Sequence, residues 1–433
     1  MSGLFNAQIL RPIAPRDDKW LEPSFVSSYA FSMLLNATST IISVPDGGGK
    51  TTLTAMAQRV MRKSWLCVEV KGDIQEQPND DHWLDPLMRE ATQQLWRYVQ
   101  ANPSCLIGIG TRATVLKYCF MRYLGSELTA FYLERLMEDH ADVSSIVKTL
   151  LAIVSIELFA TSTPDWQRLD VLADCATKLG LNGVIFWFEL HAGSTAASLV
   201  LKFASRFFDS LPFLSNGSMH FKCLAPAVTF SELAQLGGGE RSSVDLLQVS
   251  WDEPSLIELL DRRVQVASDG QLNSLAQLVD INSFCEFANA VLPSKTPREW
   301  LGLAQFIGQK MGDAGQIPLT DNAWDAARHA YYEAHIPLTL DASGTFKRGS
   351  TEVITPRQKV LHRLLSHLYD NPEPQLAYAL QQDKALNLDA TSLNTYMHRL
   401  RAAVEPFPKQ GHIYLVTDQS RGTYTLRHTD KSP

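Results

Sequence analysis

Six consecutive residues, Gly47-Gly48-Gly49-Lys50-Thr51-Thr52, have the types and spacing of a phosphate-binding loop. Glycines let successive backbone N–H groups point into one small concavity, and the following helix aims its positive end at the same anion. The Lys reaches the β- and γ-phosphates of a nucleotide, and the first Thr hydroxyl binds Mg²⁺. We therefore expect ATP and Mg²⁺ as ligands, with Thr51 on the metal. The nucleotide-binding residues would be Pro45, Asp46, Gly47, Gly48, Gly49, Lys50, Thr51 and Thr52.

The loop departs from the pattern G-x-x-x-x-G-K-[ST] at its first position, where this chain has Val44. The alternative interpretation is a glycine-rich turn that happens to precede Lys-Thr-Thr. A β-branched run before the loop and a helical pattern after it favour the phosphate-binding interpretation.

Glu189 is the candidate catalytic residue, because it ends an apolar run over residues 183–188. Nucleotide hydrolysis needs a carboxylate that orients the Mg²⁺ shell and a group that positions the attacking water. By spacing, Phe188 stands where the metal-orienting carboxylate would be, and a phenyl ring cannot coordinate a metal. Glu189 is then either a catalytic base or a strand-end carboxylate on a fold that only binds nucleotide. The pattern leaves ATP hydrolysis open, as a weak activity.

A parallel α/β sheet is the arrangement that would position these residues. Strand, glycine loop, helix and strand follow one another from residue 39 to residue 70, and residues 80–178 have mostly helical spacing. The run over residues 183–188 is almost entirely apolar, as a strand buried on both faces requires. Two further strands are expected at residues 220–224 and 246–250, and helices at residues 255–334.

Together these segments resemble P-loop NTPases of the AAA+ or STAND type, from about Phe25 to Ala334. The resemblance rests on the glycine loop, the Glu189 strand, the helix over residues 255–266 and the sequence Thr296-Pro-Arg298, which looks like the start of a lid helix. It implies that Arg298 is a nucleotide-binding sensor. It also implies that Arg262 and Arg263 are sensor or arginine-finger residues, although each arginine could equally be a surface or ion-pairing residue.

The C-terminal segment differs from the rest of the chain in its charge. Residues 351–433 contain ten Lys and Arg and eight Asp and Glu, a net charge of +2, which leaves −9 for the preceding 350 residues. A stretch of small and polar residues at 339–354 has no apolar periodicity, so we expect a linker there. A Thr355-Pro start signal, apolar residues at helical spacing and two late β-like runs then predict three helices and a two-stranded ribbon, the winged-helix plan.

This ending resembles the DNA-binding domain of response-regulator transcription factors, through the sequences Arg399-Leu-Arg401 and Arg421-Gly-Thr-Tyr-Thr-Leu. An exposed face of the third helix would then read bases and hold phosphates, with the ribbon on the DNA backbone. The expected DNA-binding residues are Asn394, Thr395, His398, Arg399, Arg401 and Arg421. Winged helices also dock proteins, so a protein partner is the alternative to double-stranded DNA.

Composition excludes several other classes of protein. With 45% hydrophobic and 20% charged residues the chain is an ordinary globular one, and a net charge of −7 argues against a uniformly basic nucleic-acid coat. The six cysteines form no CxxC pair, so we interpret them as thiols in a reducing compartment. No stretch reaches 18 apolar residues and no signal peptide is evident, which predicts a cytoplasmic protein without a membrane partner.

The expected fold class is α/β: a P-loop NTPase parallel sheet with a helical insertion and a helical lid, followed by an α+β winged helix. The expected domains are a core over residues 1–254, with its insertion at about 80–178, a lid over 255–338, a linker over 339–354 and a winged helix over 355–433. The expected function is a bacterial-type AAA+/STAND-like switch, in which ATP controls homo-oligomerisation or partner binding and the docking of the winged helix to DNA. Transcription control and defence against phages and mobile DNA are the expected settings. The alternatives are a non-hydrolysing scaffold whose winged helix holds a protein, and an ATPase subunit that delivers an effector to DNA.

Overall fold

The protein is described here by a computed structural model that covers residues 20–70, 84–153, 165–191, 196–210, 217–237, 244–314, 319–407, 412–427 and 429. Two compact units make up the described chain. The N-terminal unit comprises Ser27–Ser250 with residues 20–22, and the C-terminal unit comprises Pro23–Val26 and the described residues from Trp251 onward.

A parallel sheet of five strands forms the centre of the N-terminal unit, which confirms the predicted α/β class. The strand order is β2-β3-β4-β1-β5. The strands are β1 (Ser39–Ser43), β2 (Leu66–Val70), β3 (Val184–Glu189), β4 (Met219–Ala225) and β5 (Val244–Gln248). Every residue of β1 and β4 is buried, because helices cover both faces of the sheet.

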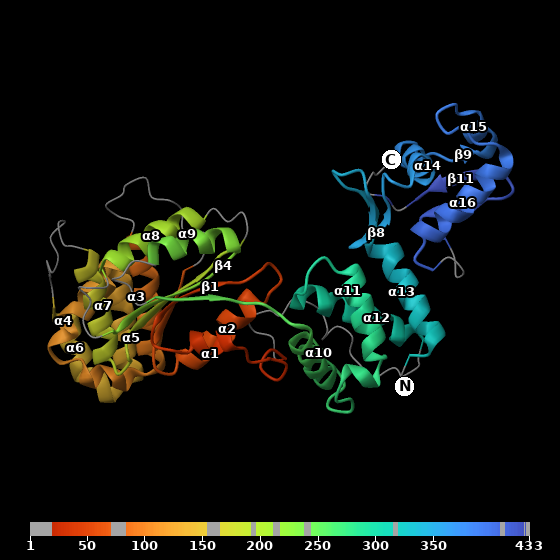
Figure 1. Ribbon diagram of the computed structural model, residues 1–433. Helices are drawn as coiled ribbons and strands as arrows, with labels where there is room; N and C mark the ends of the chain where they lie inside the picture. The colour runs from red at the N-terminus through yellow and green to blue at the C-terminus, as the bar shows by residue number, and fades with distance from the viewer. Residues whose placement is uncertain are drawn as a thin grey trace. The chain divides into compact units, whose positions relative to one another are not determined.

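Helices cover both faces of this sheet (Figure 1). One face carries α1 (Tyr29–Leu34) and α2 (Lys50–Met61), and the other carries α8 (Ala196–Ser210) and α9 (Ala227–Gly237). Successive residues of a strand point to opposite faces of the sheet, so each face presents its own set of side chains. Phe186 and Phe188 of β3 pack in the core with α8, whereas Glu189 points to the face of α2.

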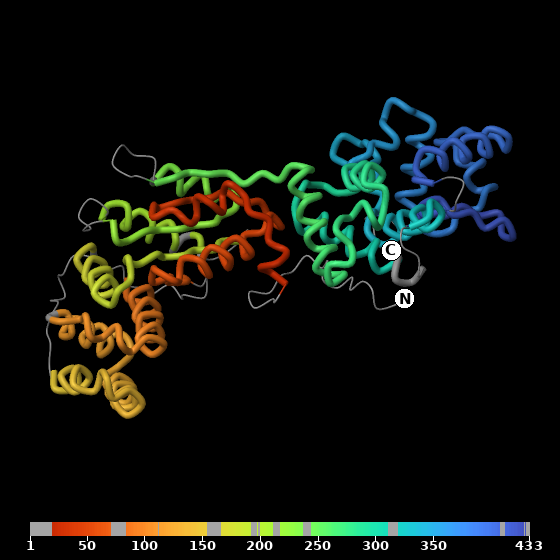
Figure 2. Tube along the Cα trace, turned by 90° about the horizontal axis from the view of Figure 1, so that it is seen from below, coloured from red at the N-terminus to blue at the C-terminus, as the bar shows by residue number. Residues whose placement is uncertain are grey.

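The described residues at 84–153 and 165–178 are mostly helical, as their apolar spacing predicts, and Figure 2 shows these helices in orange to yellow. The helix α3 packs beside β2, and apolar residues of the whole group share one core with the sheet. The helices are α3 (Asp85–Ala101), α4 (Ala113–Tyr123), α5 (Ser126–Asp139), α6 (Ser144–Ala152) and α7 (Asp165–Lys178), with short 3₁₀ turns at Pro103–Gly108, Gly110–Arg112 and Ala141–Val143.

The C-terminal unit begins with four helices and a 3₁₀ turn at Leu275–Gln277. Side-chain oxygens cap helices of this unit: Asp252 accepts from the N–H of Ser255 at 2.9 Å, Asp280 accepts from that of Ser283 at 2.8 Å, and Thr320 accepts from that of Ala323. The helices are α10 (Glu253–Ala267), α11 (Ile281–Val291), α12 (Pro297–Ala314) and α13 (Asp321–His335). Within the described ranges, no helix has the length and apolar character needed to cross a membrane.

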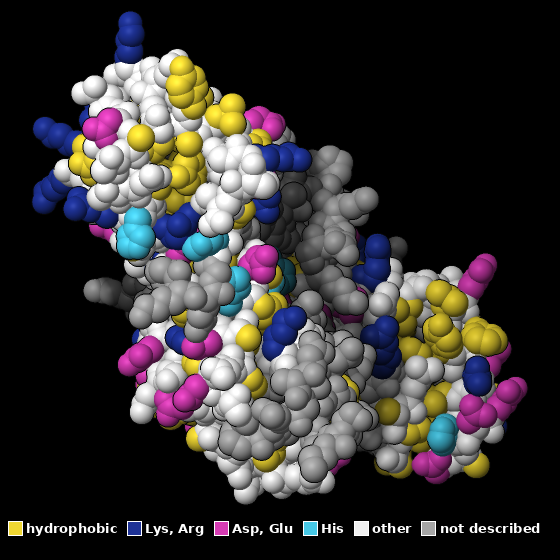
Figure 3. Space-filling model, turned by 90° about the vertical axis from the view of Figure 1, so that its right-hand side faces the viewer, with side chains coloured by type: hydrophobic (Ala, Val, Ile, Leu, Met, Phe, Trp, Pro, Cys, Tyr) yellow, Lys and Arg dark blue, Asp and Glu magenta, His cyan; other side chains and the backbone are white. Residues whose placement is uncertain are grey.

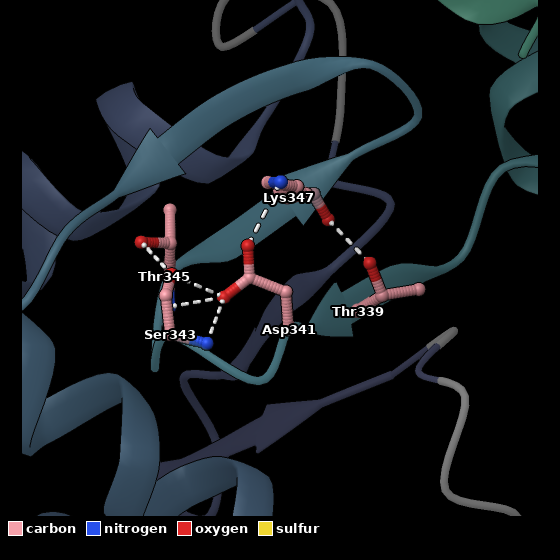
Figure 4. A network of polar contacts seen from close by, with 5 residues as sticks. All are labelled: Thr339, Asp341, Ser343, Thr345 and Lys347. Carbon is pink, nitrogen blue, oxygen red and sulfur yellow. Dashed lines mark hydrogen bonds and ion pairs between the residues drawn. The ribbon is translucent and has the colours of Figure 1, made fainter.

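Residues 339–354, expected to be a linker, instead form most of a three-stranded antiparallel sheet. Its strands are β6 (Leu338–Leu340), β7 (Phe346–Arg348) and β8 (Thr351–Ile354). The carboxylate of Asp341 fixes the first turn: it accepts from the N–H groups of Ser343 and Thr345, both at 2.9 Å, and pairs with Lys347 at 2.8 Å (Figure 4). The small, polar residues in which the sequence showed no apolar pattern are therefore turn-forming residues between very short strands.

Three helices and a small antiparallel sheet end the chain, as the apolar spacing predicts. The ribbon of β10 and β11 gains a third, two-residue strand that the sequence did not reveal. The elements are α14 (Lys359–Asp370), β9 (Gln375–Leu376), α15 (Ala377–Gln382), α16 (Ala390–Val404), β10 (Leu415–Asp418) and β11 (Thr423–Leu426), and we call them the C-terminal module.

One continuous core joins this C-terminal module to the helices α10–α13 and to the sheet β6–β8. The hydroxyl of Tyr414 donates to the carbonyl of Ile336 at 2.5 Å, and Arg348 donates to the carbonyl of Val404 at 2.8 Å. The three segments predicted as lid, linker and winged helix therefore form one compact unit.

Candidate functional site

The glycine loop lies where adjacent strands send their helices to opposite faces of the sheet. After β1 the chain enters α2 on one face, and after the neighbouring β4 it enters α9 on the other. The carboxyl ends of the two strands are level, because Ser43 pairs with Ala225. In open parallel sheets, the crevice outside the carboxyl ends at such a switch point is the usual place for a ligand.

Each of the three glycines has a specific conformational role in the loop. Gly47 and Gly49 have φ angles of 78° and 92°, in the left-handed region that favours glycine. A Cβ atom on Gly48 would lie 2.8 Å from the carbonyl oxygen of Pro45 and 2.9 Å from Cγ1 of Val44. The valine at the departing first position is buried and contributes to this tight packing, so the loop closes around Val44.

The first turn of α2 leaves its N–H groups directed out of the helix end. Gly49 is the N-cap residue, so no side chain is available there to accept from the backbone, and the first turn has no acidic residue. The uncapped N–H groups and the helix dipole together attract an anion. That these N–H groups bind a phosphate stays a prediction from the sequence motif.

The ammonium group of Lys50 is buried within the loop. Its side chain is 5% exposed, and its Nζ atom lies 2.8 Å from Oδ1 of Asp46 and 3.3 Å from the carbonyl oxygen of Val44. A cation thus stands beside the helix N-terminus in a largely desolvated setting, where its interaction with an anion is strong.

The hydroxyl of Thr51 donates a short hydrogen bond to Oε1 of Glu189. This bond joins the first turn of α2 to the carboxyl end of β3, and the Glu189 side chain is only 10% exposed. The exposed His191 lies beside the pair, with Nε2 at 3.5 Å from Oε1 of Glu189. A hydroxyl and a carboxylate in contact at one end of a glycine loop are hard oxygen ligands of the kind that Mg²⁺ takes, so the residues fit that ion.

Phe188 does not face the loop. Its ring packs against those of Phe203 and Phe221, with centroid distances of 5.1 and 5.0 Å, in the core on the opposite side of the sheet. The carboxylate in contact with Thr51 is therefore that of Glu189. The sequence spacing placed the metal-orienting carboxylate one residue earlier, at position 188. The residue that follows Glu189 is Leu190, which is 2% exposed.

The three arginines with predicted sensor roles all lie in the C-terminal unit. Arg262 donates to the carbonyl of Phe25 at 2.7 Å and to Glu258 at 2.8 Å, and Arg263 is 5% exposed. These contacts give Arg262 a structural role within the unit, whereas Arg298, the second residue of α12, is exposed. The nucleotide contacts predicted for them stay predictions.

The predicted DNA-reading face of α16 is exposed. Asn394, Thr395, His398 and Arg399 are exposed, opposite the predicted apolar stripe, whose residues are all buried: Leu393, Met397, Leu400 and Val404. Lys and Arg side chains project from the C-terminal module, in the upper part of Figure 3. Arg421 at the β10–β11 turn is 81% exposed and lies 3.7 Å from Asp418.

Arg401 differs from the other predicted DNA-binding residues. It is partly buried and donates a short hydrogen bond to the hydroxyl of Thr417 in β10. This contact ties the end of α16 to the ribbon and gives Arg401 a partner within the C-terminal module.

Glu405 is a residue that the sequence analysis missed. Its carboxylate is 2% exposed and accepts from the N–H groups of Ile413, Tyr414 and Leu415 at 2.8, 2.9 and 2.7 Å. A buried carboxylate that satisfies three backbone donors holds the start of β10 against the end of α16. Its signal in the sequence was weak: an acidic residue directly after an apolar helix stripe, where solvent exposure was the simpler expectation.

Comparison with known proteins finds no protein-family model that matches the chain, and no curated protein that matches its sequence.

Proposed function

We propose that the N-terminal unit binds ATP with Mg²⁺ at the glycine loop, as a P-loop NTPase of the AAA+/STAND type does. The observation that carries the proposal is the Thr51–Glu189 hydrogen bond at the end of a loop whose three glycines are each needed for its shape. A glycine-rich turn without a ligand would not need a buried lysine, an uncapped helix and a carboxylate at the same point.

Each residue of the site has a distinct role in this proposal. The N–H groups of residues 47–52 surround the phosphates, and Lys50 pairs with the β- and γ-phosphates. Thr51 and Glu189 would hold Mg²⁺, which neutralises the charge of the phosphates when it is bound.

Slow turnover follows from the position of Glu189. Because Glu189 meets Thr51, it takes the metal-orienting role, and the next residue, Leu190, has no group that can position or deprotonate water. We therefore favour a nucleotide-binding switch over a motor that depends on fast hydrolysis.

The C-terminal unit would be the effector of the switch. We propose that its C-terminal module is a winged helix that docks to double-stranded DNA through the exposed face of α16 and through Arg421. Since one core joins the module to α10–α13, nucleotide binding would act on the unit as a whole, in docking or in homo-oligomerisation. Transcription control and defence against mobile DNA, in the cytoplasm of a bacterial cell, are the settings that we propose.

Protein docking is the second candidate for the C-terminal module. Leu376 and Tyr378, next to each other on β9 and α15, are 54% and 67% exposed. Exposed apolar side chains of this size favour a protein partner over a phosphate backbone. Binding of labelled mixed-sequence duplex at low salt supports DNA docking, and absence of binding by the folded chain supports a protein partner.

Titration with a fluorescent ATP analogue tests the nucleotide site. Lys50→Ala should abolish binding, because the site loses the cation that meets the phosphates. Lys63→Ala is the matched control, since Lys63 is exposed just beyond the other end of α2. Equal affinity of the wild type and Lys50→Ala would contradict the proposal.

A further inference from the structure

The loop provides its own anion for Lys50. Oδ1 of Asp46 lies 2.8 Å from Nζ of Lys50, and the carbonyl oxygen of Val44 lies 3.3 Å from the same atom. The lysine side chain is 5% exposed, whereas that of Asp46 is 55% exposed. The cation that phosphates would need is therefore already neutralised by a carboxylate of the same loop.

We propose that Asp46 competes with phosphate for Lys50 and so sets the nucleotide affinity of the site; this inference rests on the proposed nucleotide-binding function. A phosphate that takes Lys50 must displace the carboxylate, or else share the cation with a second negative charge close by. Either route costs free energy that an uncharged side chain at position 46 would not demand. The ion pair thus favours the empty loop and raises the nucleotide concentration needed to fill it.

The backbone of the loop has hydrogen bonds of its own besides this ion pair. Backbone hydrogen bonds hold the loop at both ends: Val44 donates to the carbonyl of Ala225, Gly48 donates to that of Pro45, and Leu53 donates to that of Gly49, all at 2.9 Å. Asp46→Asn keeps the size and shape of the side chain and removes only its charge. This variant should therefore fold as the wild type does, which a thermal melt checks.

The test is a titration of the full chain with a fluorescent ATP analogue, with and without Mg²⁺. Asp46→Asn should bind the analogue on the order of three- to tenfold more tightly than the wild type. This range lies between the interaction energies typical of exposed ion pairs and those typical of buried ion pairs. The gain should shrink between about 0.05 and 0.5 M salt, because added salt screens the repulsion. Glu22→Gln is the matched control: Glu22 is exposed and pairs with Arg59 of α2 at 2.9 Å, so its loss should leave the affinity unchanged.

The outcomes separate this inference from the function on which it rests. Binding by the wild type with equal or weaker binding by Asp46→Asn would contradict the competition and leave the nucleotide site standing. Weaker binding of the analogue by Asp46→Asn that appears only when Mg²⁺ is present would also overturn the inference, because Asp46 would then support the metal. If both folded proteins fail to bind, the proposed function and the inference both fail, whereas binding by Asp46→Asn alone supports both.

Discussion

The hydroxyl of Thr51 and the carboxylate of Glu189, 138 residues apart in the chain, form one hydrogen bond at the carboxyl edge of the parallel sheet. The bond spans from α2 to β3 and brings together two oxygen ligands that suit Mg²⁺. The bond supports the metal-binding role that we propose for Glu189, in place of the catalytic role suggested by its position in the sequence.

Replacement of Glu189 should raise the Mg²⁺ requirement for nucleotide binding. In Glu189→Gln the amide keeps the shape of the side chain but loses the charge that orients the metal, so we expect about 10–100 times more Mg²⁺ to be needed. Titration of Mg²⁺ at a fixed concentration of fluorescent ATP analogue measures this. His191→Ala, at the exposed neighbour of Glu189, is the control and should have no such effect.

Hydrolysis of ATP by the purified chain should be slow or undetectable. The residue after Glu189 is the buried Leu190, so no carboxylate is present there to position water. A phosphate-release assay at saturating ATP and Mg²⁺ measures the rate. Robust turnover that Glu189→Gln eliminates would contradict the metal-orienting assignment and favour a motor.

The α/β class was predictable from sequence, whereas the contact between Glu189 and Thr51 was not. A strand buried on both faces has no alternation of apolar and polar residues, so the run that ends at Phe188 and Glu189 did not reveal which of the two faces α2. The strand order was not predictable either, because strands that are neighbours in the sheet are far apart in the chain. The strand β4 lies between β1 and β3, and β2 pairs with β3 although several helices separate the two in the sequence.

Very short strands caused the other error. The strands β6–β8 have three or four residues each and β9 has two, so polar turn residues such as Asp341 dominated the pattern and suggested a linker. The helix α16 was predictable because its apolar residues recur at helical spacing over 15 residues.

The carboxylate of Glu405 should be a major stabilising group of the C-terminal unit. Glu405→Gln leaves at least one of its three backbone donors with a weaker acceptor, and we expect a loss of about 2–4 kcal/mol in the free energy of unfolding. Urea denaturation followed by circular dichroism measures it. Glu373→Gln is the control at an exposed glutamate, and an equal effect of both variants would contradict the assignment.

The buried Lys222 should make the N-terminal unit more stable as pH rises above neutrality. Burial lowers the pKa of its ammonium group from 10.5 to about 7, and the nearby Asp245 offsets part of this effect. At pH values between these two pKa values, Lys222 is protonated in the unfolded chain and deprotonated in the folded one. The free energy of unfolding therefore rises with pH, by at most about 1.4 kcal/mol per pH unit.

Urea denaturation of the wild type and of Lys222→Met at about pH 7 and pH 8 tests this dependence. The variant is the matched reference, because the buried cysteines begin to ionise in the unfolded chain near pH 8.5 and lower the stability of both proteins alike. Lys222→Met should abolish the rise, because it removes the titrating group. A rise that persists unchanged in Lys222→Met would assign the effect to other residues.

The arginines of α16 should differ in their effects on DNA binding. Arg399 is exposed, so Arg399→Ala should lose about 1–3 kcal/mol on a preferred site and little on random duplex. Arg401 is held by Thr417, so Arg401→Ala should lower the stability of the fold more than the affinity for DNA. Arg421→Ala should weaken binding to all duplexes alike and lower the salt slope by about one. Gel shifts at two salt concentrations, with thermal melts, distinguish the three outcomes.

A crystal structure of the chain with a non-hydrolysable ATP analogue and Mg²⁺ would show directly whether the glycine loop binds nucleotide and metal. The account expects the β- and γ-phosphates on the N–H groups of residues 47–52 and on Lys50, with Mg²⁺ about 2.1 Å from the Thr51 hydroxyl and with Glu189 holding the metal directly or through one of its waters. Phosphates bound elsewhere, or a metal without Thr51 and Glu189 around it, would contradict the account.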